Sequence, residues 1–274
     1  MSVRRWSIGA INHISRPTVT IGLALVAWLY CITLGQTAHV LAQSAPQHSS
    51  DSPHWAYGGE EGMDHWGMLS HGYMTCETGS HQSPIDIRMP GEDRAPERLQ
   101  FHYGQVDIQA MHNGHSIQVK VSPGNELQVN GRTYRLMQFH FHEPSEHHIG
   151  GKASPFEIHL VHRDRVGHIV VVSLLADLGS GHPVVSDLWS SLPMHAGESA
   201  PSRQLDLSTL VPDSLHHFAY HGSLTTPPCT EGVQWIVMKS KISITRSQID
   251  QFVALVGHNA RAIQPVHDRR ILAE

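Results

Sequence analysis

The sequence of residues 138–148 is QFHFHEPSEHH, which places four histidines in eleven positions. In an extended strand, successive side chains point to opposite faces. His140 and His142 therefore share one face, about 7 Å apart, while Phe139 and Phe141 point to the other. Two imidazoles on one face suit either a metal site or a half-buried polar stripe. Because the chain has 24 histidines in 274 residues, spacing must decide between these interpretations.

A second alternating segment, EIHLV at residues 157–161, favours the metal site. On a strand, His159 shares a face with Glu157 and Val161, so a neighbouring strand can supply a third imidazole. Three neutral histidine nitrogens at about 2.0–2.1 Å leave one tetrahedral position of a zinc ion open, as in catalytic zinc sites. The predicted zinc ligands are His140, His142 and His159, and Gln138, Glu157 and a backbone carbonyl are expected to hold their other ring nitrogens.

The run HEPSEH within the first stretch resembles a scrambled HExxH, the helical zinc motif of metalloproteases. The spacing excludes that motif because Glu146 stands where the second histidine should be. Pro144 would also break the required helix. His147 and His148 follow this proline in an expected turn, where they should be surface residues or lie in a second layer behind the ligands.

The rest of the chain predicts a mainly β (α+β) fold. Short β-branched or alternating runs separated by Gly, Pro and Asn indicate strands. The clearest lie at residues 115–121, 138–142, 156–162 and 168–175. Helical signal is confined to residues 184–191 and 247–256, the second after an N-cap-like segment. We expect a single domain built on a large, mostly antiparallel central β-sheet with short peripheral helices.

Composition fits one globular domain. The chain is 40% hydrophobic and 16% charged, and its length is sufficient for one well-buried core. The formal net charge is −5. Without residues 1–42, which carry three arginines and no acid, 16 basic and 24 acidic residues leave −8. A net negative charge does not attract the phosphate backbone of nucleic acid, so no nucleic-acid partner is expected.

The N-terminus predicts export. Residues 19–35 form a 17-residue apolar run after several arginines, and VLA at residues 40–42 offers a cleavage site. We interpret residues 1–42 as a signal peptide, although 17 residues also reach the lower limit for an uncleaved anchor. A flexible segment over residues 43–53 then leads to the folded domain, residues 54–274. The protein is expected in the periplasm or medium, without stable membrane association once cleaved.

Cleavage would remove Cys31 and leave Cys76 and Cys229 in an oxidising compartment. We expect these two cysteines to form a disulfide. The bridge would close a loop of about 150 residues, which the chain-entropy model values at roughly 5 kcal/mol. The alternative is a pair of unrelated buried thiols.

Taken together, these motifs resemble the α-class carbonic anhydrases. The matching segments are HWAY at 54–57, QSPIDI at 82–87, NGH at 113–115, residues 138–146, EIHLVH at 157–162, GSLTTPP at 222–228 and residues 259–265. The order of QFHFH, EIHLVH and GSLTTPP makes the resemblance specific. It implies a zinc-dependent enzyme that reversibly hydrates carbon dioxide to bicarbonate and a proton.

The resemblance also implies a role for each site residue. Glu146 and Thr225 resemble a gate-keeping pair, in which the carboxylate accepts the threonine proton so that the threonine oxygen orients the nucleophile. The zinc ligands are those named above, supported by Gln138, the backbone of Asn259 and Glu157. The remaining residues are Tyr57 for the ordered water and the following substrate-binding set: Thr226 for bicarbonate, Val161, Val171, Leu224, Val233 and Trp235 for the apolar wall, and Gln118 and Asn113.

His115 matches the proton shuttle of the family, and an ordinary histidine pKa of about 6.5 suits that role. The alternative is an exposed turn histidine. Glu143 and Pro144 stand where animal members usually have Trp-Gly, which points to the bacterial, exported branch. The resemblance leaves a homodimer open, but no self-complementary face is visible in the sequence.

A non-catalytic binding module on the same fold is the alternative function. Such a module would have no evident reason to retain all three ligands together with Glu146 and Thr225, so the enzyme is favoured.

Overall fold

A computed structural model describes residues 53–88, 92–93 and 97–273 of the chain. These belong to one compact unit, residues 51–274. The signal peptide predicted over residues 1–42, and all but the last residue of the segment predicted over 43–53, lie outside the described residues. Within the described residues, no helix is both long and apolar enough to span a membrane.

A large sheet dominates this unit, and its described part contains 13 strands. Its path runs through β12 (Arg203–Asp206), β4 (Gln105–His112), β5 (Ile117–Val121), β7 (Arg132–His142), β10 (Phe156–Arg163), β11 (Ile169–Leu178), β14 (Glu231–Met238), β13 (His217–Ser223), β16 (Leu272–Ala273) and β2 (Glu92–Asp93). Beside this path, β15 (Ile242–Ile244) pairs with β11, and β6 (Glu126–Val129) pairs with β7 and with β3 (Leu99–His102). A smaller sheet contains β1 (Asp86–Ile87), β8 (His148–Ile149) and β9 (Lys152–Ala153).

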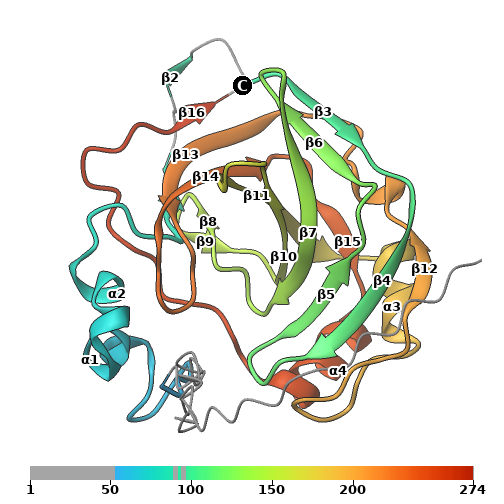
Figure 1. Cartoon of the computed structure of the whole chain (residues 1–274), viewed down its shortest axis with the longest axis horizontal. Coiled ribbons are helices and arrows are strands. Elements are labelled where there is room, and N and C mark those ends of the chain that lie inside the picture. Colours follow the sequence, from blue (N-terminus) through green and yellow to red (C-terminus); the bar gives the residue numbers. More distant parts are fainter. Residues whose placement is uncertain (1–52, 89–91, 94–96, 274) are drawn as a thin grey trace, which may run out of the picture. The chain divides into compact units, whose positions relative to one another are not determined.

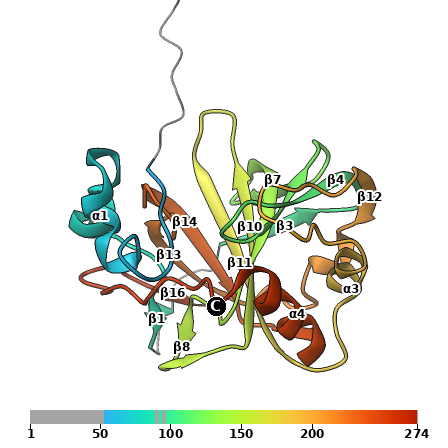
Figure 2. The ribbon, with the colours of Figure 1, turned by 90° about the horizontal axis from the view of Figure 1, so that it is seen from below.

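Short helices lie at the periphery, as the sequence predicted. They are α1 (Trp66–Leu69), α2 (Thr75–Thr78), α3 (Pro183–Trp189) and α4 (Arg246–Val256), with 3-10 turns η1 (Met63–His65), η2 (His71–Tyr73) and η3 (Ser208–Leu210). The helices α3 and α4 lie on the opposite side of the unit from α1 (Figures 1 and 2). A capping box between Thr245 and Gln248 begins α4, because it satisfies backbone N–H groups of the first turn.

The predicted fold class is confirmed. The predicted strands at residues 115–121, 138–142, 156–162 and 168–175 correspond to β5, β7, β10 and β11. Most neighbouring strands run antiparallel, and the parallel exceptions in the large sheet are β11 with β14, β11 with β15, and β16 with β2. The strand β7 begins six residues earlier than the alternating run suggested, because its first half pairs with β6.

A β-bulge in β7 explains why that first half was missed. Val161 of β10 lies opposite Gln138, but the next residue, His162, lies opposite Leu136, so Met137 has no partner. An extra residue reverses the alternation of side chains beyond it. As a result Arg135, before the bulge, lies on the same face of the sheet as Gln138 and the two predicted histidine ligands after it.

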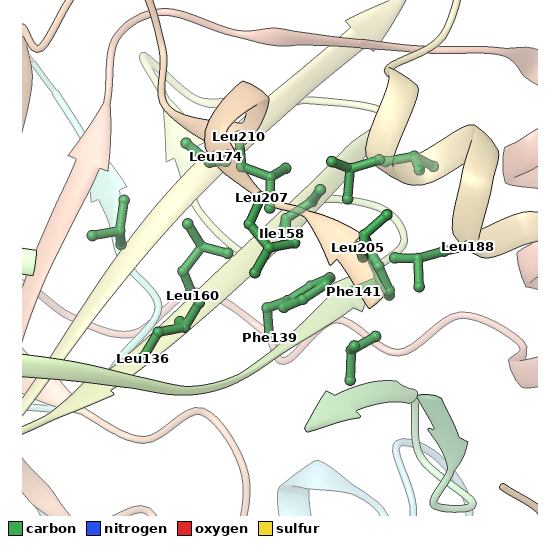
Figure 3. Packing of buried hydrophobic residues seen from close by; sticks show 14 of the residues in the cluster. Leu136, Phe139, Phe141, Ile158, Leu160, Leu174, Leu188, Leu205, Leu207 and Leu210 are labelled. Carbon is green, nitrogen blue, oxygen red and sulfur yellow. The ribbon is translucent and has the colours of Figure 1, made fainter. Parts of the chain in front are cut away.

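The other face of β7 and β10 forms the hydrophobic core. Phe139, Phe141, Ile158 and Leu160 are fully buried and pack with leucines from α3 and from the region of β12 and η3 (Figure 3). Burying each such side chain contributes about 1.5–3 kcal/mol. The core therefore fixes the orientation of both strands and leaves the opposite face for the histidines.

The expected disulfide is confirmed, since Cys76 in α2 is bonded to Cys229 just before β14. It links positions 153 residues apart. Such a bridge fits an exported protein, because disulfides persist mainly in oxidising compartments. It also ties the N-terminal helices to the segment that carries Thr225 and Thr226.

Candidate metal centre

Three histidines meet at the middle of the large sheet. His140 and His142 come from β7, and His159 of β10 lies directly opposite His140. One ring nitrogen of each lies within 4.8 Å of the other two. The ring centroids are 4.5 to 5.3 Å apart. The structure thus brings the three predicted ligands together.

Hydrogen bonds on the far side of each ring determine which nitrogen faces the centre. Nδ1 of His140 lies 2.8 Å from Oε1 of Gln138, and Nδ1 of His142 lies 2.9 Å from the backbone oxygen of Asn259. In His159 the other nitrogen is held, because Nε2 lies 2.8 Å from Oε1 of Glu157. Since these oxygens accept, the held nitrogens carry the protons. The ring nitrogens that carry no proton, the bare nitrogens, are Nε2 of His140, Nε2 of His142 and Nδ1 of His159.

The donor set fits a zinc ion. Nε2 of His142 is buried and has no hydrogen-bond partner in the described part of the chain. Leaving a buried polar atom unsatisfied costs free energy, so a binding partner for this nitrogen is expected between the three rings. Burial lowers the pKa of His142 to about 4 despite the opposing hydrogen bond to Asn259, and it also lowers the pKa of His140 and His159. Neutral imidazoles are the form that binds metal.

Glu157 is the central residue behind the ligands. It is fully buried, and besides His159 it accepts hydrogen bonds from Nδ1 of His147 at 2.7 Å and from the hydroxyl of Ser173 at 2.5 Å. Backbone N–H groups of residues 146 and 147 also donate to it. Burial alone would raise the pKa of Glu157, but the two histidines outweigh burial and hold this pKa well below its ordinary value. The carboxylate is therefore charged and fixed in place.

Sequence reasoning left His147 either on the surface or in a second layer, and the structure buries it completely in the second layer. Its Nε2 lies 2.8 Å from the hydroxyl of Tyr220, which in turn lies 2.9 Å from the hydroxyl of Ser83. His148 is half-buried in β8. Glu157 was the available signal for the burial of His147, because a buried carboxylate needs several hydrogen-bond donors around it.

Glu146 and Thr225 lie beside the ligands. Oε1 of Glu146 accepts the backbone N–H of Arg261 at 2.9 Å, and Oε2 lies 3.8 Å from Nδ1 of His159. Oε2 has no well-aligned hydrogen bond within the described residues. Burial raises the pKa of Glu146 to about 7, against the opposing effects of His159, the Arg261 N–H and the Thr225 hydroxyl. The Thr225 hydroxyl thus has a carboxyl oxygen of Glu146 to donate to.

A cavity of about 360 Å³ opens over the bare nitrogens. Its lining contains these predicted residues: Tyr57, Asn113, His115, Gln118, Gln138, His140, His142, His159, Val161, Val171, Leu224, Thr225, Thr226 and Trp235. Val233 does not line this cavity and lies buried in one core cluster with Val171 and Trp235. Glu146, Glu157 and Asn259 also lie behind the lining.

His115 sits in the turn between β4 and β5, at the edge of this cavity. Oδ1 of Asn113 accepts the backbone N–H groups of His115 and Ser116 at 2.9 and 2.8 Å, and Gly114 supplies the positive φ of 89° that the turn requires. The His115 ring stacks on Trp55 with centroids 3.7 Å apart. Partial burial, together with the charges of neighbouring histidines, lowers the pKa of His115.

Trp55 is a cavity residue that sequence reasoning did not assign to the site. It lies within the HWAY segment, whose aromatic residues were the available signal. Tyr57 of the same segment lines the cavity too, and its pKa is raised well above 10, first by burial and then by the nearby Glu146. Tyr57 therefore stays protonated and can donate a hydrogen bond into the cavity.

Comparison with known proteins agrees with this geometry. The family model for eukaryotic-type carbonic anhydrase matches residues 61–274. A carbonic anhydrase of Pectobacterium carotovorum is 40% identical over 227 residues, 82% of this chain and 92% of that protein. One of Neisseria gonorrhoeae is 40% identical over 234 residues, 84% of this chain and 92% of that protein.

The fold of a solved structure is also close. The α-carbonic anhydrase from Thermovibrio ammonificans, in complex with the inhibitor sulfanilamide, matches with a TM-score of 0.78 and 37% identity. The match covers 80% of this chain and 98% of that chain. Family model, relatives and fold agree over most of the length, and the chain belongs to the eukaryotic-type, or α-class, carbonic anhydrase family.

Proposed function

We propose that His140, His142 and His159 hold a zinc ion, at which the chain reversibly hydrates carbon dioxide to bicarbonate and a proton. The observation that carries the proposal is the convergence of three bare ring nitrogens, one of them buried without a partner among the described residues. A zinc ion held there would lower the pKa of a water molecule bound to it from 15.7 to about 7, the value established for carbonic anhydrases in general.

Glu146 and Thr225 orient the attacking nucleophile. The Thr225 hydroxyl acts on the Glu146 carboxyl as a donor, and the Arg261 N–H holds the other oxygen of that carboxyl. Once its own proton points at Glu146, the threonine oxygen can only accept a hydrogen bond. The nucleophile must then donate its proton to Thr225, which turns its lone pair toward the substrate.

An apolar wall receives carbon dioxide, which is linear and carries no charge. Val161, Val171, Leu224 and Trp235 line the cavity next to the histidines. The indole N–H of Trp235 donates to the backbone oxygen of Ser223 at 2.9 Å, so that ring is fixed in place. Apolar walls take an apolar substrate from water without strong binding. Thr226, at the same cavity, is the proposed contact of bicarbonate.

His115 is the proposed group that carries the remaining proton to solvent. It lies at the cavity edge, half-buried and stacked on Trp55, with the exposed His54 ring centroid 6.1 Å away. Its lowered pKa keeps the imidazole neutral at pH 7, and only a neutral ring can accept a proton.

We further propose that the protein acts outside the cytoplasm, in the periplasm or the medium, after removal of residues 1–42. The disulfide and the apolar N-terminal run support this location. Carbon dioxide and bicarbonate are then its small-molecule partners. The alternative of a non-catalytic binding module has no observation in its favour, because the complete ligand set stands beside Glu146 and Thr225.

The proposed function is tested by measuring zinc content and hydration on the same purified preparations. Batches of the full chain with different zinc occupancy are assayed by stopped-flow hydration of carbon dioxide. We expect the rate per chain to rise in proportion to zinc, up to one zinc per chain. A preparation with one zinc per chain that hydrates carbon dioxide no faster than buffer would contradict the proposal.

Replacing His115 with alanine tests the shuttle. The hydration turnover in dilute buffer is expected to fall by about tenfold or more, and added imidazole should restore it. The ratio kcat/KM should stay unchanged, because the proton leaves after carbon dioxide has reacted. Since the pKa of His115 lies below its usual value, protonation of His115 should limit turnover only at a lower pH than for an ordinary histidine. Unchanged turnover in dilute buffer would remove His115 from this role.

A further inference from the structure

Two arginines stand side by side on the face of the sheet that carries the three histidines. Arg163 of β10 lies directly opposite Arg135 of β7, beyond the bulge described above. Directly opposite side chains in an antiparallel pair have their Cβ atoms about 4.5–5.5 Å apart, and like charges in such a pair destabilise the sheet. The like-charge pair costs free energy, and an anion bound between the two guanidinium groups would offset that cost.

Within the described residues, neither Arg135 nor Arg163 forms an ion pair with a carboxylate. The Nε and Nη2 atoms of Arg135 point to the sulfur of Met137, at 3.4 and 3.3 Å, rather than to Glu126, which lies directly opposite Arg135 on β6. Neither Arg163 nor the nearby Arg165 forms an ion pair in this part of the chain. Both are exposed.

The carboxylate of Asp164, which lies between Arg163 and Arg165 in the sequence, is bound by other groups. Its carboxylate forms an ion pair with Arg132 and a hydrogen bond with Nδ1 of His168 at 2.9 Å. It also accepts the backbone N–H groups of Val166 and His168 at 3.0 and 2.8 Å. These bonds close the turn between β10 and β11, which projects beyond the sheet (Figure 2).

The turn also positions Arg163. A Cβ atom on Gly167 would lie 3.4 Å from Nη2 and 3.8 Å from Nε of Arg163, so the guanidinium packs against the turn. The φ of Gly167 is +102°, a conformation that other residues rarely adopt. The guanidinium is thus held beside the backbone of the turn, where it lines a groove on the surface.

The arginines line a groove of about 1020 Å³. Its charged lining residues are Arg132, Arg135, Arg163, Arg165, Glu126 and Asp164. Four arginines against two acids make the groove positive on a chain whose formal net charge is −5. Met137 and Arg163 line both this groove and the 360 Å³ cavity, so the two are neighbours.

We propose that Arg135 and Arg163 bind a small oxyanion with at least two negative charges, of the phosphate or pyrophosphate class, at the rim of the cavity. A guanidinium group donates two parallel hydrogen bonds to an oxyanion, and two such groups side by side match a multivalent one. Arg165 supplies a further positive charge from the turn. The groove has room for more than a single phosphate group.

The rim site is separate from the metal centre. Arg163 is four residues beyond His159 on β10, and a strand rises about 3.3 Å per residue, which gives a distance of about 13 Å along the strand. A phosphate group between the arginines therefore does not reach the bare ring nitrogens. The site does not depend on the proposed reaction, and its binding can be measured without an activity assay.

Calorimetric titration of the full chain with pyrophosphate tests the site. The test variant is Arg135→Gln with Arg163→Gln, and the control is Arg98→Gln with Arg246→Gln, which removes two charges from exposed positions outside the groove. We expect wild type and control to bind one pyrophosphate per chain, and the test variant to bind about tenfold more weakly or worse. Phosphate should bind more weakly than pyrophosphate, and binding should weaken as salt is added.

Three outcomes would overturn the proposal. The first is equal binding by wild type and the test variant, and the second is an equal loss in the control, which would indicate only net charge. The third is loss of pyrophosphate binding in His142→Ala with the arginines intact, since the anion would then sit at the metal centre. Low-salt thermal unfolding shows whether the test variant has folded, and relief of the like-charge pair predicts that its Tm is no lower than that of wild type.

Discussion

Replacing His142 with alanine is expected to abolish both zinc binding and hydration of carbon dioxide. His142 Nε2 is the buried nitrogen that lacks a partner among the described residues, and its ring is fixed by the Asn259 backbone. Losing a hydrogen-bond partner of a ligand already costs about 10–100-fold in metal affinity or activity, and losing the ligand itself costs more. Two remaining histidines cannot hold the three-nitrogen geometry of a catalytic zinc site.

His195 provides the matched control, because it is an exposed histidine in the loop after α3 and lies outside the cavity. His195→Ala should keep one zinc per chain and the full hydration rate. The measurement is zinc per chain after dialysis against a weak chelator, together with stopped-flow hydration. If His142→Ala retained one zinc per chain and most of its activity, the three-histidine centre would be wrong.

Removing the disulfide should produce the largest change in stability. The bridge between Cys76 and Cys229 spans 153 residues, and the chain-entropy model gives it roughly 5 kcal/mol at 25 °C. Domains are typically stable by only about 5–15 kcal/mol, so the double variant Cys76→Ala, Cys229→Ala should be close to unfolding. The effect arises mainly in the unfolded chain, which the bridge no longer restricts.

Urea unfolding of wild type and the double variant measures this loss. The m-value is expected to rise in the variant, because its unfolded state exposes more surface. Adding reductant should lower the wild-type free energy of unfolding to that of the variant and leave the variant itself unchanged. A difference below about 1 kcal/mol between the oxidised wild type and the variant would contradict the entropic estimate.

The shared face of the candidate histidine ligands could be predicted because it depends on local alternation. His140 and His142 are two residues apart on one strand, and Glu157 and His159 on another, so period-2 geometry fixes their shared faces in any sheet. The family resemblance then supplied the residues that no local rule connects, such as Thr225. The fold class followed from the same short alternating runs.

The positions of His147 and Trp55 could not be predicted from the local sequence. His147 follows a proline in a polar run, and local sequence gives no reason to bury it. Its burial depends on Tyr220, 73 residues away, and on the Glu157 carboxylate. Trp55 acquires its position through stacking on His115, a residue from a separate turn.

By itself, the sequence determined four central strands, the two later helices, the three candidate histidine ligands and the cysteines available for pairing, because these depend on spacing along the chain. Only the tertiary structure decided that His147 is buried against Glu157 and Tyr220, and that Arg135 faces Arg163. The pairing of the two arginines depends on strand register, which a single bulge at Met137 shifts by one residue. Register is set by packing of the whole sheet and its core, so no local stretch of sequence contains it.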